Sequence, residues 1–275
     1  MVELSKRSGI TGPPAPQVLV SMKGISKSFG AVKALQGVNL ELYASEILGL
    51  VGDNAAGKTT LMKILSGALP PDEGEIFFEG RPAHVGSPRE ARHLGIEMVH
   101  QDFALCKNLW IAGNIYMGRE PKRGLAGKLF GVLDKPKMLR GAEEILRCQN
   151  VSVGSCRKKA GALSGGQQQS VAIARAVGFN AKVVIMDEPT ASLGVKQSER
   201  LLELTQSLPK QGVSVIYITH RMHDIFLLCD RIMVLKTGTN VGVFNKADVT
   251  VDDIVRMMIL GRLGTEEPRT SGHRP

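Results

Sequence analysis

The most informative local pattern in this chain is Gly52-Asp53-Asn54-Ala55-Ala56-Gly57-Lys58-Thr59, followed by Thr60. It fits the phosphate-loop pattern G-x-x-x-x-G-K-[ST]. Residues 46–51 before it are mostly apolar and predict a buried strand, and residues 60–65 predict the first turns of a helix. Glycines let the backbone bend so that successive N–H groups and the helix N-terminus point at one anion. We therefore expect Lys58 to reach terminal phosphates and the Thr59 hydroxyl to ligate magnesium, the alternative being a glycine turn that merely begins a helix.

Two adjacent carboxylates follow a second apolar segment further along the chain. Residues 183–186 form a continuous apolar run, as expected of a parallel strand covered on both faces, and Asp187 and Glu188 come directly after it. Open α/β sheets bind ligands at the C-terminal ends of their strands. Asp187 is thus placed to hold magnesium, directly or through water, and Glu188 to polarise an attacking water. An acidic loop surface is the weaker alternative because a phosphate loop precedes it.

Strand and helix patterns alternate over most of the remaining chain. Further strands are predicted at residues 18–22, 38–42, 75–80, 96–99, 213–218, 231–235 and 240–244. Helices are predicted at residues 138–147, 167–179, 196–208 and 251–260. Residues 1–17 are rich in Pro and Gly and predict a disordered tail, and the polar residues 261–275 predict a flexible one. Few strand signals occur in the middle of the chain, and we expect a helical subdomain at about residues 102–178.

Composition is that of an ordinary globular protein, with 43% hydrophobic and 22% charged residues in a chain of 275. The formal net charge of +9 suits anionic partners such as nucleotides, nucleic acid or acidic lipid headgroups. The four cysteines include no C-x-x-C pair, so no zinc or disulfide framework is predicted. No apolar run approaches the length of a membrane span, and no secretory signal is apparent. A role in transport would therefore need a pore made by another chain.

The most specific string in the sequence is Leu163-Ser164-Gly165-Gly166-Gln167, which resembles the signature of the ATP-binding cassette (ABC) ATPases. Three further positions match family elements in the family's order. Phe29 matches the aromatic residue that stacks on adenine, Gln101 the glutamine that senses magnesium and water, and His220 the switch histidine that contacts the terminal phosphate. The resemblance covers Val18 to about Leu260. A core aromatic or a capping histidine would be the ordinary explanation of Phe29 or His220 taken alone.

The resemblance implies an α/β fold, with a P-loop NTPase core built on a mainly parallel sheet, an N-terminal antiparallel β subdomain and a helical insert. It implies a single ABC ATPase domain at residues 18–260 that uses ATP and Mg²⁺. The implied catalytic residues are Glu188, His220, Lys58 and Gln101. The implied metal site comprises Thr59, Gln101 and Asp187. The implied nucleotide-binding residues are Phe29, Gly52, Asp53, Asn54, Ala55, Ala56, Gly57, Lys58, Thr59, Thr60, Gln101, Ser164, Gly165, Gly166, Gln167 and Asp187.

In the family the signature faces the nucleotide of the other subunit, so two cassettes close head-to-tail over two ATP molecules. Several strings look like those of importers of simple sugars of the ribose, xylose and fructose type; they lie at residues 53–58, 87–91, 101–102, 114–120 and 188–195. Many members carry two cassettes in one chain, whereas this chain carries one. The implied partners are a second copy, a transmembrane permease and, indirectly, a periplasmic sugar-binding protein. The implied location is the cytoplasmic face of the bacterial inner membrane, as a peripheral subunit.

Four positions depart from the family pattern. Ala55 replaces a glycine common in the loop, and Ser45 a usual glycine before Glu46. His100 replaces a frequent tyrosine. Gly194 stands where many cassettes have an aspartate that helps to couple the two sites, which leaves the degree of cooperativity open.

Two other functions remain as alternatives at this point. One is an ABC-type ATPase acting on nucleic acid or in another non-transport role, which the basic charge would suit. Such proteins usually carry linked cassettes, a coiled-coil insertion or zinc cysteines, which this sequence lacks, so no nucleic acid partner is expected. A general phosphate-loop kinase would leave the string at residues 163–167 unexplained.

Overall fold

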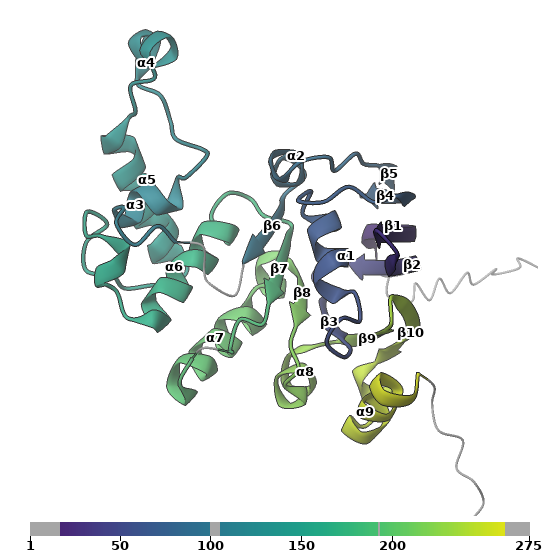
Figure 1. The fold of residues 1–275 in the computed structure, drawn as a ribbon. Helices are drawn as coiled ribbons and strands as arrows, with labels where there is room; N and C mark the ends of the chain where they lie inside the picture. The colour runs from purple at the N-terminus through teal and green to yellow at the C-terminus, as the bar shows by residue number, and fades with distance from the viewer. Residues whose placement is uncertain (1–16, 100–104, 192, 262–275) are drawn as a thin grey trace, which may run out of the picture.

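The computed structural model describes residues 17–99, 105–191 and 193–261, which are organised around two sheets (Figure 1). Sheet A is antiparallel with the strand order β2-β1-β4-β5. Its strands are β1 Val18–Phe29, β2 Val32–Tyr43, β4 Glu73–Phe78 and β5 Arg81–Pro82. β1 and β2 form one long hairpin that is longer than the two strands predicted from sequence. Shifts of register, including one between Met22 and Ile25, interrupt the alternation by which a strand is recognised.

Sheet B is mainly parallel and has the strand order β10-β9-β3-β8-β7-β6. Its strands are β3 Ile47–Val51, β6 Ile96–Val99, β7 Val183–Asp187, β8 Ser214–Ile218, β9 Arg231–Lys236 and β10 Thr239–Asn245. Only the β9–β10 pair is antiparallel. The predicted fold class is therefore confirmed: a mainly parallel α/β core accompanied by an antiparallel sheet.

The longer helices agree with the periodic segments of the sequence, and the shorter ones had no such signal. The helices are α1 Lys58–Leu65, α2 Pro88–His93, α3 Ile111–Ile115, α4 Gly124–Phe130, α5 Lys135–Cys148, α6 Gly165–Val177, α7 Val195–Ser207, α8 Met222–Leu228 and α9 Val251–Leu260. Sequence patterns predicted α1, α5, α6, α7 and α9. They missed α2, α3, α4 and α8, each at most seven residues long, because two turns are too few to show a helical period.

The two faces of sheet B pack against different partners. Alternate residues such as Leu50, Ile185 and Ile216 share one core with α1 and sheet A. Their neighbours along the strands, such as Val51 and Met186, share a second core with α6, α7, α8 and α9. This alternation is the ordinary consequence of a strand period of two residues in a sheet covered on both sides. Sheet B is thus the middle layer of the molecule.

A third core joins the helices of the middle of the chain. It consists of α3, α5 and one side of α6, through residues such as Ile111, Leu139 and Val171. In Figure 1 these helices lie to one side of the sheets, and α4 lies at the far end of that group. Within the described residues, no helix has the length and apolar character needed to cross a membrane.

A buried carboxylate connects the end of β2 to the beginnings of β3 and β9. Glu46 is only 5% exposed, and its carboxylate accepts hydrogen bonds from the Tyr43 backbone N–H at 2.7 Å and from the Arg231 guanidinium at 3.2 Å. The same guanidinium lies 4.5 Å from the centre of the Tyr43 ring. Burial raises the pKa of Glu46 although the Tyr43 N–H and Arg231 act to lower it. Glu46 therefore depends on both partners to remain charged.

We predict that Arg231→Met lowers the free energy of unfolding by about 2 kcal/mol at neutral pH, because it leaves a buried carboxylate without its cation. Without Arg231 the pKa of Glu46 rises further, so the folded variant holds a proton at a pH where the unfolded chain has lost it. The difference in unfolding free energy between the wild type and Arg231→Met should therefore become smaller as the pH is lowered into the range in which carboxyl groups titrate. Urea denaturation at several pH values measures both effects. The control is the double variant Arg231→Met/Glu46→Gln, which should regain most of the stability; an equal loss in single and double variants would contradict the prediction.

Candidate functional site

The register of sheet B brings three loops to one edge. β3 pairs with β8 so that Leu50 lies opposite Ile218, and β7 pairs with β8 so that Asp187 also lies opposite Ile218. Because all three strands are parallel, their C-terminal ends coincide. The phosphate loop leaves β3, the acidic pair ends β7 and residues 219–220 leave β8 at this edge. Segments far apart in the sequence thus become neighbours.

The phosphate loop has the backbone shape that its glycines allow. Gly57, at the N-cap of α1, has φ +99°, and a Cβ there would lie 2.7 Å from the Ala34 carbonyl oxygen. A Cβ on Gly52 would lie 2.2 Å from the Leu235 carbonyl oxygen. Both glycines are therefore required by close packing of the loop against β2 and β9 as well as by backbone conformation. These contacts position the loop where α1 begins.

Ala55 adopts a conformation that disfavours a side chain. Its φ is +66°, in the left-handed region. Each L-residue there costs roughly 1–2 kcal/mol. The glycine that the family commonly has at this position would avoid that cost, so the substitution noted in the sequence places strain in the loop.

Lys58 lies between the loop and the acidic pair. Its ammonium donates hydrogen bonds to the carbonyl oxygens of Gly52 and Asp53, at 2.7 and 2.9 Å. Burial lowers the pKa of Lys58, and the carboxylates of Glu188, Asp187 and Asp53 oppose this effect. The structure therefore brings the predicted phosphate-binding cation within the electrostatic range of the predicted acids.

Glu188 and His220 are in direct contact. The His220 Nδ1 lies 3.0 Å from the Glu188 carboxylate, and the Thr219 hydroxyl donates to the same carboxylate at 3.3 Å. The Glu188 backbone N–H donates to the Ile218 carbonyl at 2.9 Å, and its φ is +48°. A non-glycine residue with this φ is uncommon and is held by its surroundings. The two residues, 32 positions apart in sequence, form one unit at the sheet edge.

Phe29 is placed by the β1–β2 hairpin. It pairs with Val32 at the end of the hairpin, and both side chains are more than half exposed. Two residues further along β2, Ala34 lies against Gly57 of the phosphate loop. Phe29 thus presents an open aromatic face on the element that packs against the loop, as stacking on a base requires.

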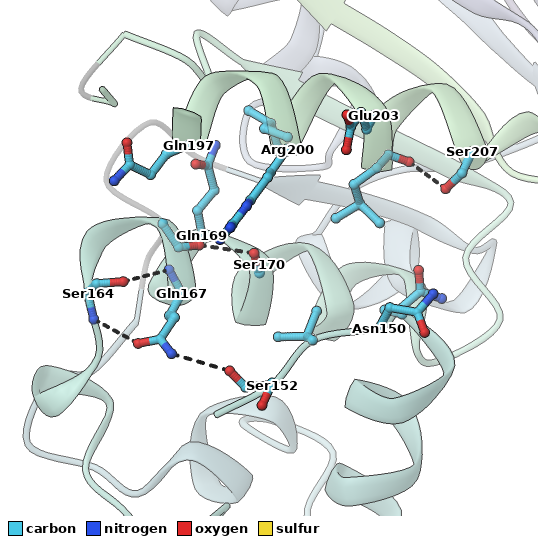
Figure 2. Close-up of a pocket in the computed structure, with 15 residues that line it drawn as sticks. Asn150, Ser152, Ser164, Gln167, Gln169, Ser170, Gln197, Arg200, Glu203 and Ser207 are labelled. Carbon is cyan, nitrogen blue, oxygen red and sulfur yellow. Dashed lines mark hydrogen bonds between the residues drawn. The ribbon is translucent and has the colours of Figure 1, made fainter. Parts of the chain in front are cut away.

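The signature string forms the beginning of α6 (Figure 2). The Ser164 hydroxyl accepts from the Gln167 backbone N–H at 3.3 Å, and the Gln167 side chain accepts from the Ser164 backbone N–H at 3.1 Å. This is a reciprocal capping box. Gln167 also donates to the Ser152 carbonyl at 3.3 Å. Ser164, Gly165 and Gln167 are exposed, so the free N–H groups of this helix start face outward.

An open cleft of about 680 Å³ lies beside this helix start (Figure 2). It is bounded by the end of α5, by α6 and by α7, whose Gln197 lies against Gly166 and whose Arg200 points toward Ser170. On the inner side, buried Gln169 of α6 donates to the Pro189 carbonyl, one residue after Glu188. The signature helix and the acidic loop are therefore connected within the chain.

Gly194 is the N-cap of α7 and offers no side-chain cap, which an aspartate at this position would supply.

Two of the predicted motifs are not brought together. The phosphate loop and α1 belong to one face of sheet B, whereas α6 packs on the other. In the described ranges, no hydrogen bond or ion pair joins residues 164–167 to residues 52–60.

Gln101, which was predicted to serve in catalysis, nucleotide binding and metal binding, lies outside the described residues. β6 ends at Val99, opposite Met186.

Oxygen donors for a hard cation are present at the sheet edge, although they do not form a carboxylate cluster. Within the part of the chain that is described, no group of three or more His, Cys, Asp or Glu side chains is arranged to hold a metal. Thr59 is exposed at the start of α1, and Asp187 is half-buried at the end of β7. A hydroxyl, a carboxylate and phosphate oxygens are ligands that Mg²⁺ accepts. These two side chains suit a magnesium ion whose remaining ligands would include oxygens of a bound polyphosphate.

Sequence reasoning missed a buried group that connects the acidic loop to α8. Asp224 is fully buried, and its carboxylate accepts from the Thr190 hydroxyl at 2.9 Å. Arg221, next to His220, lies 3.7 Å from the same carboxylate. Burial and, to a lesser degree, Asp224 raise the pKa of the nearby Tyr217 hydroxyl. The only sequence signal was an acidic residue four positions after the histidine, which a pattern cannot distinguish from a surface charge.

Comparison with known proteins gives one consistent result. The family model described as ABC transporter matches residues 35–191. The chain is 42% identical to the fructose import ATP-binding protein of Rhizobium meliloti, over 92% of this chain and 97% of the relative. It is 42% identical to the xylose/arabinose import ATP-binding protein of Sulfolobus acidocaldarius, over 91% and 99%. It is 44% identical to the ribose import ATP-binding protein of Chromobacterium violaceum, over 91% of this chain but only 49% of that relative.

Solved structures agree with the sequence relatives. A nucleotide-free ATP-binding cassette from an ABC transporter superposes with a TM-score of 0.77 at 27% identity, over 88% of this chain and 98% of that one. A bacterial ABC transporter cassette solved as a dimer gives a TM-score of 0.68 at 27% identity, over 83% and 99%.

We predict that Asp224→Ala lowers the free energy of unfolding by about 2 kcal/mol, because it leaves the buried Thr190 hydroxyl without its acceptor. Asp224→Asn keeps an acceptor oxygen at the same place and should retain most of that stability. Chemical denaturation of the three proteins measures the difference. Equal stability of the Ala and Asn variants would show that the hydrogen bond to Thr190 does not stabilise the fold.

Proposed function

Because this chain belongs to the ABC transporter family and is an ATP-binding ATPase, we propose that it is the hydrolysing subunit of an importer for a simple sugar. The observation that supports this most directly is the sheet edge of β3, β8 and β7. It gathers a phosphate loop, an acidic pair and a histidine, which are the parts that nucleotide hydrolysis needs.

The first role is that of Lys58 and the loop. The ammonium would exchange its bonds to the Gly52 and Asp53 carbonyls for phosphate oxygens, assisted by the N–H groups at the start of α1. Phe29 would stack on the adenine. When bound, Mg²⁺ would neutralise phosphate charge, with Thr59 and Asp187 as its protein ligands.

The second role is that of Glu188. Its carboxylate is half-buried and oriented by the Thr219 hydroxyl and by His220, which leaves it able to accept a proton from an attacking water. His220 is 72% exposed in its side chain, so it can turn toward a terminal phosphate while its neighbour remains in place. Gln101 is proposed, on the family resemblance, to complete the metal and water site.

The third proposal is assembly as a head-to-tail dimer with two shared ATP sites. The phosphate loop and the signature of one chain belong to opposite faces of sheet B, and the signature N–H groups face outward. A second copy could bring its signature to the first copy's loop, and a related cassette has been solved as a dimer. Closure would then follow from the affinity of both motifs for the terminal phosphate.

The fourth proposal concerns cargo and partners. Relatives over 40% identical are named as fructose, xylose/arabinose and ribose import proteins, and two of them have nearly the length of this chain. We infer a simple sugar as cargo, a separate permease as the membrane partner and a periplasmic binding protein as the source of specificity. The limits of the domain, residues 18–260, and of its helical subdomain, about 102–178, remain a prediction. The working location would be the cytoplasmic face of the membrane.

We predict that Glu188→Gln lowers ATP turnover by at least about a hundredfold, because an amide cannot accept the proton of the attacking water. ATP binding should persist, since Lys58 and the loop are unchanged. The measurements are steady-state phosphate release with the permease present and nucleotide affinity by titration. Glu199→Gln, an exposed carboxylate on α7, is the matched control and should behave as the wild type. Near-normal turnover in Glu188→Gln would refute the assignment.

We predict that two inactive variants restore each other when mixed. Lys58→Ala damages the loop and spares the signature, whereas Ser164→Arg blocks the signature and spares the loop. A mixed dimer has one site with both motifs intact, so co-expression with the permease should return partial ATPase activity and ATP-dependent dimer closure. The control is each variant alone, in which both sites are damaged. If mixed dimers form and neither activity nor closure returns, the two motifs do not meet across the interface.

A further inference from the structure

A short hairpin with a helical tip projects from the group of helices at the side of the sheets. Its two arms are joined by a bridge between Lys122 and Leu133, and the Arg123 N–H donates to the Val132 carbonyl at 2.9 Å. α4 forms the tip and ends at Gly131, which has φ +72°. Figure 1 shows α4 standing away from all other labelled elements. The Asp134 N–H also donates to the Pro121 carbonyl at 2.8 Å, so backbone hydrogen bonds between the two arms close the base of the hairpin.

Gly127 determines which side of α4 faces outward. A Cβ at this position would lie 2.7 Å from the Val132 carbonyl oxygen and 2.9 Å from the Lys122 carbonyl carbon. Only a glycine lets the helix approach its own base so closely. Leu125 and Leu129 are two residues before and after Gly127, which places them about 160° away on the opposite side of the helix. The leucines are thus directed into solvent by the backbone itself.

The tip of the hairpin carries several exposed apolar side chains, of which Leu125 and Leu129 share the outward side of α4. The exposed fractions are 75% for Leu125, 71% for Leu129 and 81% for Phe130, and Val132 and Leu133 follow at 47% and 39%. These five side chains lie within nine consecutive residues. The other large exposed apolar side chains of the described residues are spread over several different elements. Singly exposed apolar side chains need no explanation, whereas a concentrated group marks a contact surface.

Basic residues surround this apolar tip. Residues 119–137 contain six Lys or Arg and two Asp or Glu. Arg119 is paired with Glu97, and Asp134 accepts from the Lys137 backbone N–H. No ion-pair partner is found in the described residues for the side chains of Lys122, Arg123, Lys135 and Lys137. The flanks of the hairpin therefore carry uncompensated positive charge.

We propose that the hairpin of residues 121–134 is a docking surface for an anionic lipid membrane. Leu125, Leu129 and Phe130 enter the boundary between headgroups and acyl chains, and the flanking lysines and arginines meet anionic headgroups. An apolar side bordered by cations is the pattern of segments that lie in a membrane interface. Side chains more than 70% exposed on a short helix project outward and form no groove, which suits a fluid lipid surface better than a shaped protein partner.

This surface goes beyond the proposed function. None of the proposed nucleotide, catalytic or metal residues lies in the hairpin, so membrane contact and hydrolysis can be measured separately. A membrane contact of its own would restrict the orientation of the subunit beside its permease, and it would not require the permease for binding.

The test is sedimentation of the purified full chain with two kinds of vesicle. One contains about three parts phosphatidylcholine to one part phosphatidylglycerol, and the other contains phosphatidylcholine alone. We expect binding to the anionic vesicles that weakens with added salt. Leu129→Ser/Phe130→Ser should lower the affinity by about tenfold or more, because each apolar side chain contributes through burial. Lys122→Gln/Arg123→Gln should lower it by a similar factor through lost charge.

The matched control is Ile259→Ser, which removes a side chain of 60% exposure on α9 and should leave vesicle binding unchanged. ATP hydrolysis without vesicles should be unchanged in all variants, which shows that they are folded and keeps this proposal distinct from the assignment of the ATPase site. Phe130→Trp gives a direct reading of insertion, since lipids brominated on their acyl chains should quench the added fluorescence.

Three results would overturn the proposal. The first is equal vesicle binding by the wild type and the two double variants. The second is absence of acyl-chain quenching of Phe130→Trp at saturating vesicles. The third is that Leu129→Ser/Phe130→Ser abolishes binding to detergent-solubilised permease, or self-association, while vesicle binding stays as in the wild type; the hairpin would then be a protein-docking surface.

Discussion

The parallel register of β3, β8 and β7 is the constraint on which the candidate site depends. Leu50 and Asp187 both lie opposite Ile218, so three loops leave the sheet at the same height. A shift of one residue in either pairing would reverse the faces of a strand and displace its loop along the sheet. Such a shift would exchange side chains between two closely packed cores and leave both badly fitted. Packing of the interior therefore positions the C-terminal ends of β3, β8 and β7, where the candidate site lies.

The two-sided sheet also explains why one chain does not contain a complete site. α1 must pack on one face to begin at the phosphate loop, and α6 packs on the other, where it supports the signature. The same burial that stabilises each motif keeps the two apart. An outward-facing capping box on α6 is stable by itself and leaves free N–H groups for a ligand on a second molecule. This geometry is the physical basis of the dimer that we propose.

Strain and buried charge are concentrated around the site. Ala55 and Glu188 both have left-handed backbone conformations, and Asp224 is a fully buried carboxylate beneath the loop that follows Glu188. Each is unfavourable in isolation and persists because surrounding contacts over-determine it. Thr219 and His220 hold the Glu188 carboxylate, and Asp224 connects Thr190 to α8, which follows the histidine. The loop after β7 and the loop after β8 are thereby fixed to each other.

Local periodicity and turn residues were enough to predict the strand–loop–helix at residues 46–65, the apolar strand at 183–186, the helix after the signature and the α/β class. The sequence also indicated the site residues by type and order. The contact between Glu188 and His220 and the buried Asp224–Thr190 pair were decided by tertiary structure, because strands distant in sequence had to pair first. The outward direction of Leu125 and Leu129 was likewise decided by the close approach of Gly127 to Val132. A sequence shows that a side chain is apolar, but the direction it faces depends on which neighbouring backbone can come close.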